Sequence, residues 1–183
     1  MSADLRFRKT IRVRGIAKEF AAGAGSCTAG VASLDGASVE IRSGEILLVC
    51  GPRGAGKTTL LLCVAGMLHF DAGEIVGRMG GVSYRDLARP LAALEGWPAG
   101  GAILLDSCDE VGDLSHPRVA HALATALATG SAIVLATRDP ERTLSLAPAS
   151  ATISIVHLRL GRIVSRSEVG VVHRVAEAAS GGY

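Results

Sequence analysis

The hydrophobic pattern of the chain is dominated by short apolar runs, each long enough for one strand. Such runs occur at Glu45 to Cys50, Ala102 to Asp106 and Ala132 to Ala136. A nearly continuous apolar run of this length, without polar alternation, is typical of a strand that is buried on both faces of a parallel sheet. The pattern therefore predicts a central sheet whose strands are mostly parallel.

Other segments have the alternation or the turn signals of antiparallel strands. Hydrophobic and polar residues alternate at Ile11 to Arg14 and again at Ala37 to Ile41, before a turn at Ser43-Gly44. A turn that starts at Asp71 leads into a short strand. Near the end of the chain, Thr152 to Leu158 and Arg162 to Val164 flank a turn at Leu160-Gly161, which predicts a closing hairpin.

Helical spacing of apolar residues marks three further segments. They are Lys57 to about Met67, Arg85 to Leu94, and Val119 to Ala128 with Pro117 near its start. Residues 21–30 lack periodicity and are expected to form a flexible loop, and residues 176–183 are expected to fray. Together the elements predict a three-layer α/β fold, with a mostly parallel central sheet and an antiparallel β portion from the N-terminal segment.

Composition narrows the possible classes of protein. With 183 residues, of which 49% are hydrophobic, the chain can form one sizeable core, and we expect a single domain over residues 1–183. A net charge of +2 and only 3% aromatic residues argue against a nucleic-acid partner. Because no apolar stretch is long enough for a membrane span and the four cysteines lack metal-ligand spacing, we expect a protein of the reducing cytoplasm.

A glycine-rich segment follows the first apolar run and leads into the first predicted helix. Residues 51–58 match the pattern G-x-x-x-x-G-K-[ST], which predicts a phosphate-binding loop. Its three glycines allow the N–H groups of the loop to face inward, and the helix start presents its positive dipole end to an anion. Lys57 is expected to reach the β- and γ-phosphates. The expected nucleotide contacts in this segment are Gly51, Pro52, Arg53, Gly54, Ala55, Gly56, Lys57, Thr58 and Thr59.

Two oxygen ligands for Mg²⁺ are expected near this loop. One is the hydroxyl group of Thr58, and the other is the carboxylate of Asp106, which ends an apolar strand. The alternative for Asp106 is a structural role, in which its side chain caps the turn after the strand.

The order of these segments resembles the nucleotide-binding domain of the ATP-binding cassette (ABC) transporter family, in the P-loop NTPase superfamily. The resemblance extends from about Ile11 to Val164 and is carried by Ser33 to Glu45 before the loop, by Thr59-Leu60-Leu61, Ala65-Gly66 and Asp71 to Ile75 after it, and by Leu158 to Ile163. The resemblance implies that the chain binds ATP with Mg²⁺. It also places Phe20 where the family has an aromatic residue that stacks on adenine, and Asp113 at the family's D-loop aspartate. A structural role stays open for both residues.

The chain departs from the family at positions that carry its chemistry. Ser107 stands where the family has a catalytic glutamate, and Arg138 stands where it has a switch histidine. The chain contains no glutamine, so it has neither the Q-loop glutamine nor an intact LSGGQ signature. The short separation between the phosphate loop and the strand-end carboxylate implies that the helical subdomain is reduced. Asp109 and Glu110 are the candidates to replace the missing glutamate.

The resemblance implies a degenerate ATP-binding subunit that binds Mg·ATP and hydrolyses it weakly or not at all. It further implies a protein partner, either a second nucleotide-binding domain or a membrane subunit. The expected location is the cytoplasm, and a chain that binds a membrane subunit would be peripheral at the inner face of that membrane. Two alternatives stay open: a nucleotide-sensing or structural module without a transport role, and an unrelated small P-loop kinase or GTPase. A GTPase is disfavoured because the chain has no asparagine for a guanine-reading N-K-x-D motif.

Overall fold

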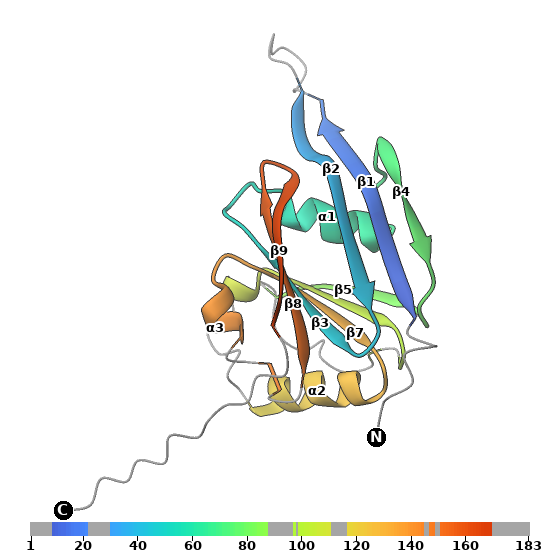
Figure 1. The fold of residues 1–183 in the computed structure, drawn as a ribbon, viewed down its shortest axis with the longest axis vertical. Helices are drawn as coiled ribbons and strands as arrows, with labels where there is room; N and C mark the ends of the chain where they lie inside the picture. Colours follow the sequence, from blue (N-terminus) through green and yellow to red (C-terminus); the bar gives the residue numbers. More distant parts are fainter. Residues whose placement is uncertain are drawn as a thin grey trace, which may run out of the picture.

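Two β-sheets and three α-helices make up the part of the chain that the computed structural model describes, which is residues 9–21, 30–87, 97, 99–110, 117–144, 147–148 and 151–169 (Figure 1). The larger sheet has the strand order β5-β6-β7-β3-β8-β9, and the smaller has the order β2-β1-β4. The strands of the larger sheet are β3 (Glu45–Cys50), β5 (Val82–Asp86), β6 (Ala102–Asp106), β7 (Ala132–Thr137), β8 (Thr152–Arg159) and β9 (Arg162–Val169).

The larger sheet is parallel from β5 to β8, and β9 adds an antiparallel edge through the β8–β9 hairpin. Side chains of the central strand β3 alternate between two separate cores. Ile46, Leu48 and Cys50 enter one core, and Leu47 and Val49 enter the other. Because both faces of the strand are buried, all of its residues after Glu45 are apolar. The predicted mostly parallel central sheet and the predicted closing hairpin are therefore confirmed.

The smaller sheet is antiparallel and consists of β1 (Thr10–Phe20), β2 (Val31–Arg42) and β4 (Ala72–Gly77). Its first strand contains an irregularity at Gly15, where φ is +59° and the pairing with β2 shifts register between Val13 and Ile16. A bulge of this kind bends the strand and increases its twist. The expected antiparallel portion from the N-terminal segment is confirmed.

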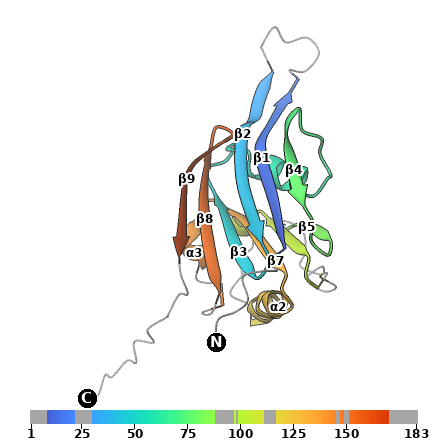
Figure 2. The same cartoon turned by 45° about the vertical axis from the view of Figure 1, so that its right-hand side comes forward.

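Helices cover both faces of the parallel sheet. The helix α1 (Lys57–Val64) lies between the two sheets, where its Leu60 and Leu61 share a core with residues of β1 and β2. The helix α2 (Pro117–Ala128) packs on the opposite face through Leu123 and Ala126 and is seen nearly end-on in Figure 2. The short helix α3 (Pro140–Leu144) and the 3₁₀ helix η2 (Cys108–Glu110) follow the ends of β7 and β6. In the described ranges, no helix is long and apolar enough to cross a membrane.

Several sequence predictions need correction. Arg85 belongs to strand β5 and not to the start of a helix, because Val82–Asp86 pairs in parallel with β6 along its whole length. Backbone pairing with a neighbouring strand outweighs the local helical spacing. The rest of the predicted helix, residues 88–94, lies outside the described residues. The first helix ends at Val64, three residues before the expected end. A flexible loop and a frayed end were also predicted. Residues 22–29 of that loop and residues 176–183 lie outside the described residues, so neither prediction is tested.

Candidate phosphate-binding site

A cavity of about 320 Å³ lies beyond the carboxyl-terminal ends of β3, β6 and β7. These three strands are neighbours in the parallel sheet, so the segments that follow them meet at one edge, which is where open α/β sheets bind ligands. The residues that line the cavity are Ser33, Arg53, Gly54, Ala55, Gly56, Lys57, Thr58, Thr59, Asp106, Ser107, Asp109, Ala136 and Arg138. The structure thus brings together most of the predicted loop contacts and both predicted metal ligands.

Two glycines of the loop lie where a side chain would collide with the main chain. A Cβ atom on Gly51 would meet the carbonyl oxygen of Leu158 in β8, and one on Gly56 would meet the carbonyl oxygen of Ser33 in β2. Gly56 also has φ of +102°, a conformation that other residues rarely adopt. Since the obstacles are backbone atoms, no side-chain rotation relieves them. Glycine at these two positions therefore allows the loop to lie against both sheets.

The turn of the β8–β9 hairpin supports the phosphate loop. The backbone N–H of Gly161 donates to the carbonyl oxygen of Ala55 at 3.0 Å, and the carbonyl oxygen of Gly161 accepts from the N–H of Asp35 at 2.9 Å. The Arg162 side chain forms an ion pair with Asp35 at 2.7 Å. The hairpin turn is thus bonded both to the loop and to β2.

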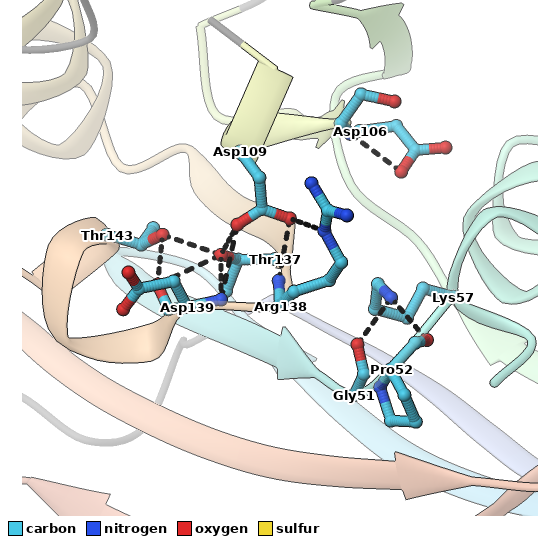
Figure 3. Close-up of polar contacts among 10 residues, drawn as sticks. Gly51, Pro52, Lys57, Asp106, Asp109, Thr137, Arg138, Asp139 and Thr143 are labelled. Carbon is cyan, nitrogen blue, oxygen red and sulfur yellow. Dashed lines mark hydrogen bonds and ion pairs between the residues drawn. The ribbon is translucent and has the colours of Figure 1, made fainter. Parts of the chain in front are cut away.

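The side chain of Lys57 folds back over its own loop, as Figure 3 shows. Its Nζ donates to the carbonyl oxygen of Gly51 at 2.6 Å and to that of Pro52 at 2.9 Å. Burial lowers the pKa of Lys57 from its usual value, while the carboxylates of Asp109 and Asp106 act in the opposite direction. The ammonium group therefore lies beside the glycine loop, where its positive charge can bind a phosphate group.

The two threonines at the start of α1 have different surroundings. Thr58 is exposed and lines the cavity, so its hydroxyl group is open to a ligand. Thr59 is buried, and its hydroxyl group lies 2.7 Å from that of Ser33 in β2. Ser33 is a lining residue that sequence reasoning did not single out, because only the packing of β2 beside α1 brings it to the cavity.

Asp106 is 3% exposed at the end of β6, and both of its carboxylate oxygens accept hydrogen bonds. Oδ1 accepts from the backbone N–H of Ser107 at 2.8 Å, and Oδ2 accepts from the Tyr84 hydroxyl group at 3.1 Å. Each oxygen retains a further lone pair. Together with the Thr58 hydroxyl group, this carboxylate offers the hard oxygen donors that Mg²⁺ prefers, so the residues fit the expected metal.

A second carboxylate, Asp109, is bonded to residues at the end of β7 and directly after it (Figure 3). Oδ1 accepts from the Thr137 hydroxyl group at 2.6 Å and from the N–H of Asp139 at 3.2 Å. Oδ2 accepts from the N–H of Arg138 at 2.7 Å and from its Nε at 3.1 Å. Burial alone would raise the pKa of Asp109, but these hydrogen bonds together hold it below its ordinary value. Neither Thr137 nor this arrangement was predicted from the sequence.

The remaining sequence candidates lie elsewhere. Phe20 is 42% exposed at the end of β1, outside the lining of the cavity, with Lys18 Nζ 5.7 Å from its ring centre. Gly51 and Pro52 take part through the carbonyl groups that bind Lys57 and do not line the cavity. The side chain of Glu110 and the whole of Asp113 lie outside the described residues.

The segment around this loop is similar in sequence to known proteins. Residues 34–95 match the family described as ABC transporter. The sulfate/thiosulfate import ATP-binding protein CysA of Bradyrhizobium diazoefficiens is 41% identical over 66 residues, which is 36% of this chain and 17% of that protein. The putative ribose/galactose/methyl galactoside import ATP-binding protein 1 of Burkholderia ambifaria is 35% identical over 69 residues, which is 38% of this chain and 12% of that protein. The matched segment therefore spans only a small part of these relatives.

Similarity to solved structures extends over most of the chain. A dimeric bacterial ABC transporter cassette gives a TM-score of 0.63 at 13% identity, covering 86% of this chain and 98% of that one. A nucleotide-free ATP-binding cassette from an ABC transporter gives 0.61 at 15% identity, covering 88% and 92%. At such identities the similarity shows the fold alone. The fold is that of an ATP-binding cassette and, with the family match around the phosphate loop, the resemblance to the ABC nucleotide-binding domains of the P-loop NTPase superfamily is confirmed.

Proposed function

We propose that the cavity binds Mg·ATP, with the phosphate chain lying over residues 51–58. The observation that carries this proposal is the position of Lys57, whose ammonium group crosses the glycine loop in a cavity that Thr58 and Asp106 also line. The volume of about 320 Å³ is at the lower end of the range for small-molecule sites, about 300–1,000 Å³. A space of that size accommodates a phosphate chain, while the base lies nearer the surface.

In this proposal different residues of the chain bind different parts of Mg·ATP. The N–H groups of the loop and of the first turn of α1 hold the β-phosphate, and Lys57 exchanges its carbonyl partners for phosphate oxygens. Thr58 and Asp106 would hold Mg²⁺, which when bound neutralises charge on the β- and γ-phosphates. Phe20 remains the candidate for the adenine contact, from the end of β1.

We further propose that hydrolysis is weak or absent. Ser107, directly after Asp106, has a hydroxyl group that cannot act as a base near neutral pH. Asp109 accepts four hydrogen bonds from Thr137 at the end of β7 and from the two residues that follow it, so both of its carboxylate oxygens already have donors. Lack of a general base typically costs on the order of 10²–10⁴ in rate. If turnover is found, Asp109→Ala and Glu110→Ala would reveal whether either acid supplies the base.

Ligand linkage tests the binding proposal. A ligand that binds only the folded chain raises the free energy of unfolding by about 2.7 kcal/mol at a hundredfold excess over Kd. Mg·ATP should therefore raise the melting temperature of the unmodified chain and of a control, Lys9→Ala, which removes a lysine outside the cavity lining. The increase should be abolished in Lys57→Ala. An increase of equal size in Lys57→Ala would refute binding over the glycine loop.

The missing signature suggests that the chain acts beside a protein partner. ABC cassettes enclose ATP between the phosphate loop of one domain and the LSGGQ signature of another, and this chain has only the first. A partner domain with an intact signature could close the cavity from the γ-phosphate side. Light scattering with Mg·ATP and pull-down from native extract test this. An ATP-induced homodimer with full ATPase activity and no copurifying protein would contradict it.

A further inference from the structure

We propose that Tyr84 is a positioning residue for Mg²⁺, because its hydroxyl group holds the carboxylate of Asp106 in the orientation that the metal requires. The proposal rests on the binding of Mg·ATP described above and extends it to a side chain outside the lining of the cavity. Tyr84 acts through Asp106 and makes no contact of its own with the metal or the nucleotide.

The sheet places Tyr84 and Asp106 on the same face. Strand β5 pairs in parallel with β6, and Tyr84 lies beside Leu104, two residues before Asp106. Because the side chains of a strand alternate between its faces, Leu104 and Asp106 share the face of Tyr84. This face is the one that α1 covers, since Tyr84 packs against the core that contains Leu60 and Leu61. The hydroxyl group therefore reaches Asp106 from the side of the sheet on which α1 lies.

Donors from two different elements hold the carboxylate of Asp106. The Tyr84 hydroxyl group donates to Oδ2 at 3.1 Å, and the backbone N–H of Ser107 donates to Oδ1 at 2.8 Å. Ser107 is the next residue in the chain, so its N–H moves together with Asp106. Tyr84 belongs to a separate strand, and its hydrogen bond therefore ties the carboxylate to the rest of the sheet and restricts its rotation.

A fixed carboxylate suits Mg²⁺ better than it suits larger cations. The Tyr84 ring is partly buried against the core, so packing determines where its hydroxyl group lies, and Asp106 is itself buried. Each carboxylate oxygen keeps a lone pair for a cation after accepting its hydrogen bond. Mg²⁺ requires a near-ideal octahedron of oxygen ligands, whereas Ca²⁺ accepts a flexible arrangement. An oriented carboxylate should therefore favour Mg²⁺ over Ca²⁺.

Two competing explanations predict different results when the hydroxyl group is removed. If the bond only satisfies the hydroxyl group of a partly buried tyrosine, its loss lowers stability and leaves cation binding unchanged. If the bond mainly withdraws negative charge from Asp106, its loss strengthens the binding of every divalent cation. Orientation predicts the opposite sign, with Mg²⁺ weakened more than Ca²⁺. Hydrogen-bonding partners of metal ligands typically contribute about 10–100-fold to metal affinity.

Calorimetric titration with ATP in Mg²⁺, in Ca²⁺ and in EDTA tests the assignment. The contribution of each cation is the ratio of the dissociation constant for ATP in EDTA to that with the cation. Tyr84→Phe should lower the Mg²⁺ ratio about tenfold and the Ca²⁺ ratio less, and should change the dissociation constant in EDTA less than about twofold. Ser83→Ala is the matched control and should leave all three constants unchanged. It removes a hydroxyl group from the opposite face of β5, where Ser83 lies beside Ile103 of the other core.

A further variant, Asp106→Asn, separates this proposal from the one on which it depends. It should remove most of the Mg²⁺ contribution, because it replaces the charged ligand with a neutral amide. An unchanged Mg²⁺ ratio in Asp106→Asn would refute both the metal site and the role of Tyr84. If Asp106→Asn lowers the ratio and Tyr84→Phe leaves it unchanged or raises it, the role of Tyr84 alone is overturned. A lower melting temperature of Tyr84→Phe without nucleotide, at an unchanged Mg²⁺ ratio, would show that the bond is purely structural.

Discussion

The two sides of the cavity follow the ABC pattern to different degrees. The side formed by residues 51–58 has the expected glycines, lysine and threonine, and its lysine is bonded to its own loop. On the opposite side, at the ends of β6 and β7, Asp106 matches the ABC pattern, whereas Ser107 and Arg138 stand where the family has a catalytic glutamate and a switch histidine. This difference is the basis of the proposal that the chain binds Mg·ATP and hydrolyses it weakly or not at all.

The two sides are also held in place by different means. The loop side depends on close approach of backbones, since Gly51 and Gly56 face main-chain carbonyl groups. The opposite side depends on side-chain hydrogen bonds that converge on Asp109. Substitutions on the two sides should therefore have different structural effects. A substitution in the loop should displace the backbone, whereas a substitution of Asp109 or of a residue bonded to it should remove individual hydrogen bonds.

The largest effect is expected for Gly51→Ala on the loop side. The added methyl group would collide with the Leu158 carbonyl group, and a collision of this kind should cost about 3 kcal/mol in the free energy of unfolding, measured by urea denaturation. Gly54→Ala is the matched control, because its Cβ atom would enter open space and only its φ of +78° is unfavourable, at about 1 kcal/mol. Equal costs for both variants would show that close backbone approach does not fix the loop.

A smaller loss is expected for Thr137→Val on the opposite side. Thr137 is fully buried, and its hydroxyl group donates to Asp109 and accepts from Thr143. The valine keeps the shape but removes one hydrogen bond from each of these partners, so we expect a loss of about 2 kcal/mol. Thr152→Val in β8 is the control, with a change below about 0.5 kcal/mol, since no described residue hydrogen-bonds its side chain. A loss in Thr137→Val no larger than in the control would contradict the importance of this group.

The smallest effect is expected from lowering the pH. The difference in melting temperature between the unmodified chain and Asp109→Asn reports on the Asp109 carboxylate alone. Its pKa is lowered in the folded chain, so its stabilisation is complete above the ordinary value of 3.8 and is lost as pH falls through the folded-state value. Between about pH 5 and pH 2, the melting temperature of the unmodified chain should fall more than that of Asp109→Asn. Other carboxylates contribute equally to both proteins. Parallel curves would show that Asp109 is not stabilised in its charged form.

The sequence was a good guide wherever a feature depends on local pattern. The apolar runs predicted β3, β6 and β7, because a strand buried on two faces requires consecutive apolar residues. The glycine spacing predicted the loop, because its tight turns require glycine at fixed positions. Asp106 was found for the same reason, since it follows directly after an apolar run. The structure places this carboxylate beside the loop, as expected.

Features that depend on pairing between distant residues were not predicted. Strand β5 forms because it pairs with β6, although Arg85 and its neighbours have helical spacing. Ser33 reaches the cavity only because β2 packs beside α1. The bonds between Asp109 and Thr137 join the ends of adjacent strands, which are far apart in the sequence. Such contacts have no periodic signal, and only the fold reveals them.

The most direct test of the proposed division between binding and hydrolysis measures both on one preparation. The purified chain is titrated with Mg·ATP by calorimetry, and phosphate release is followed in the same sample at saturating ATP. We predict saturable binding that Lys57→Ala abolishes, together with turnover well below about 1 s⁻¹, the lower end of the ordinary range for enzymes. Saturable binding with turnover above that rate by the chain alone would contradict the account.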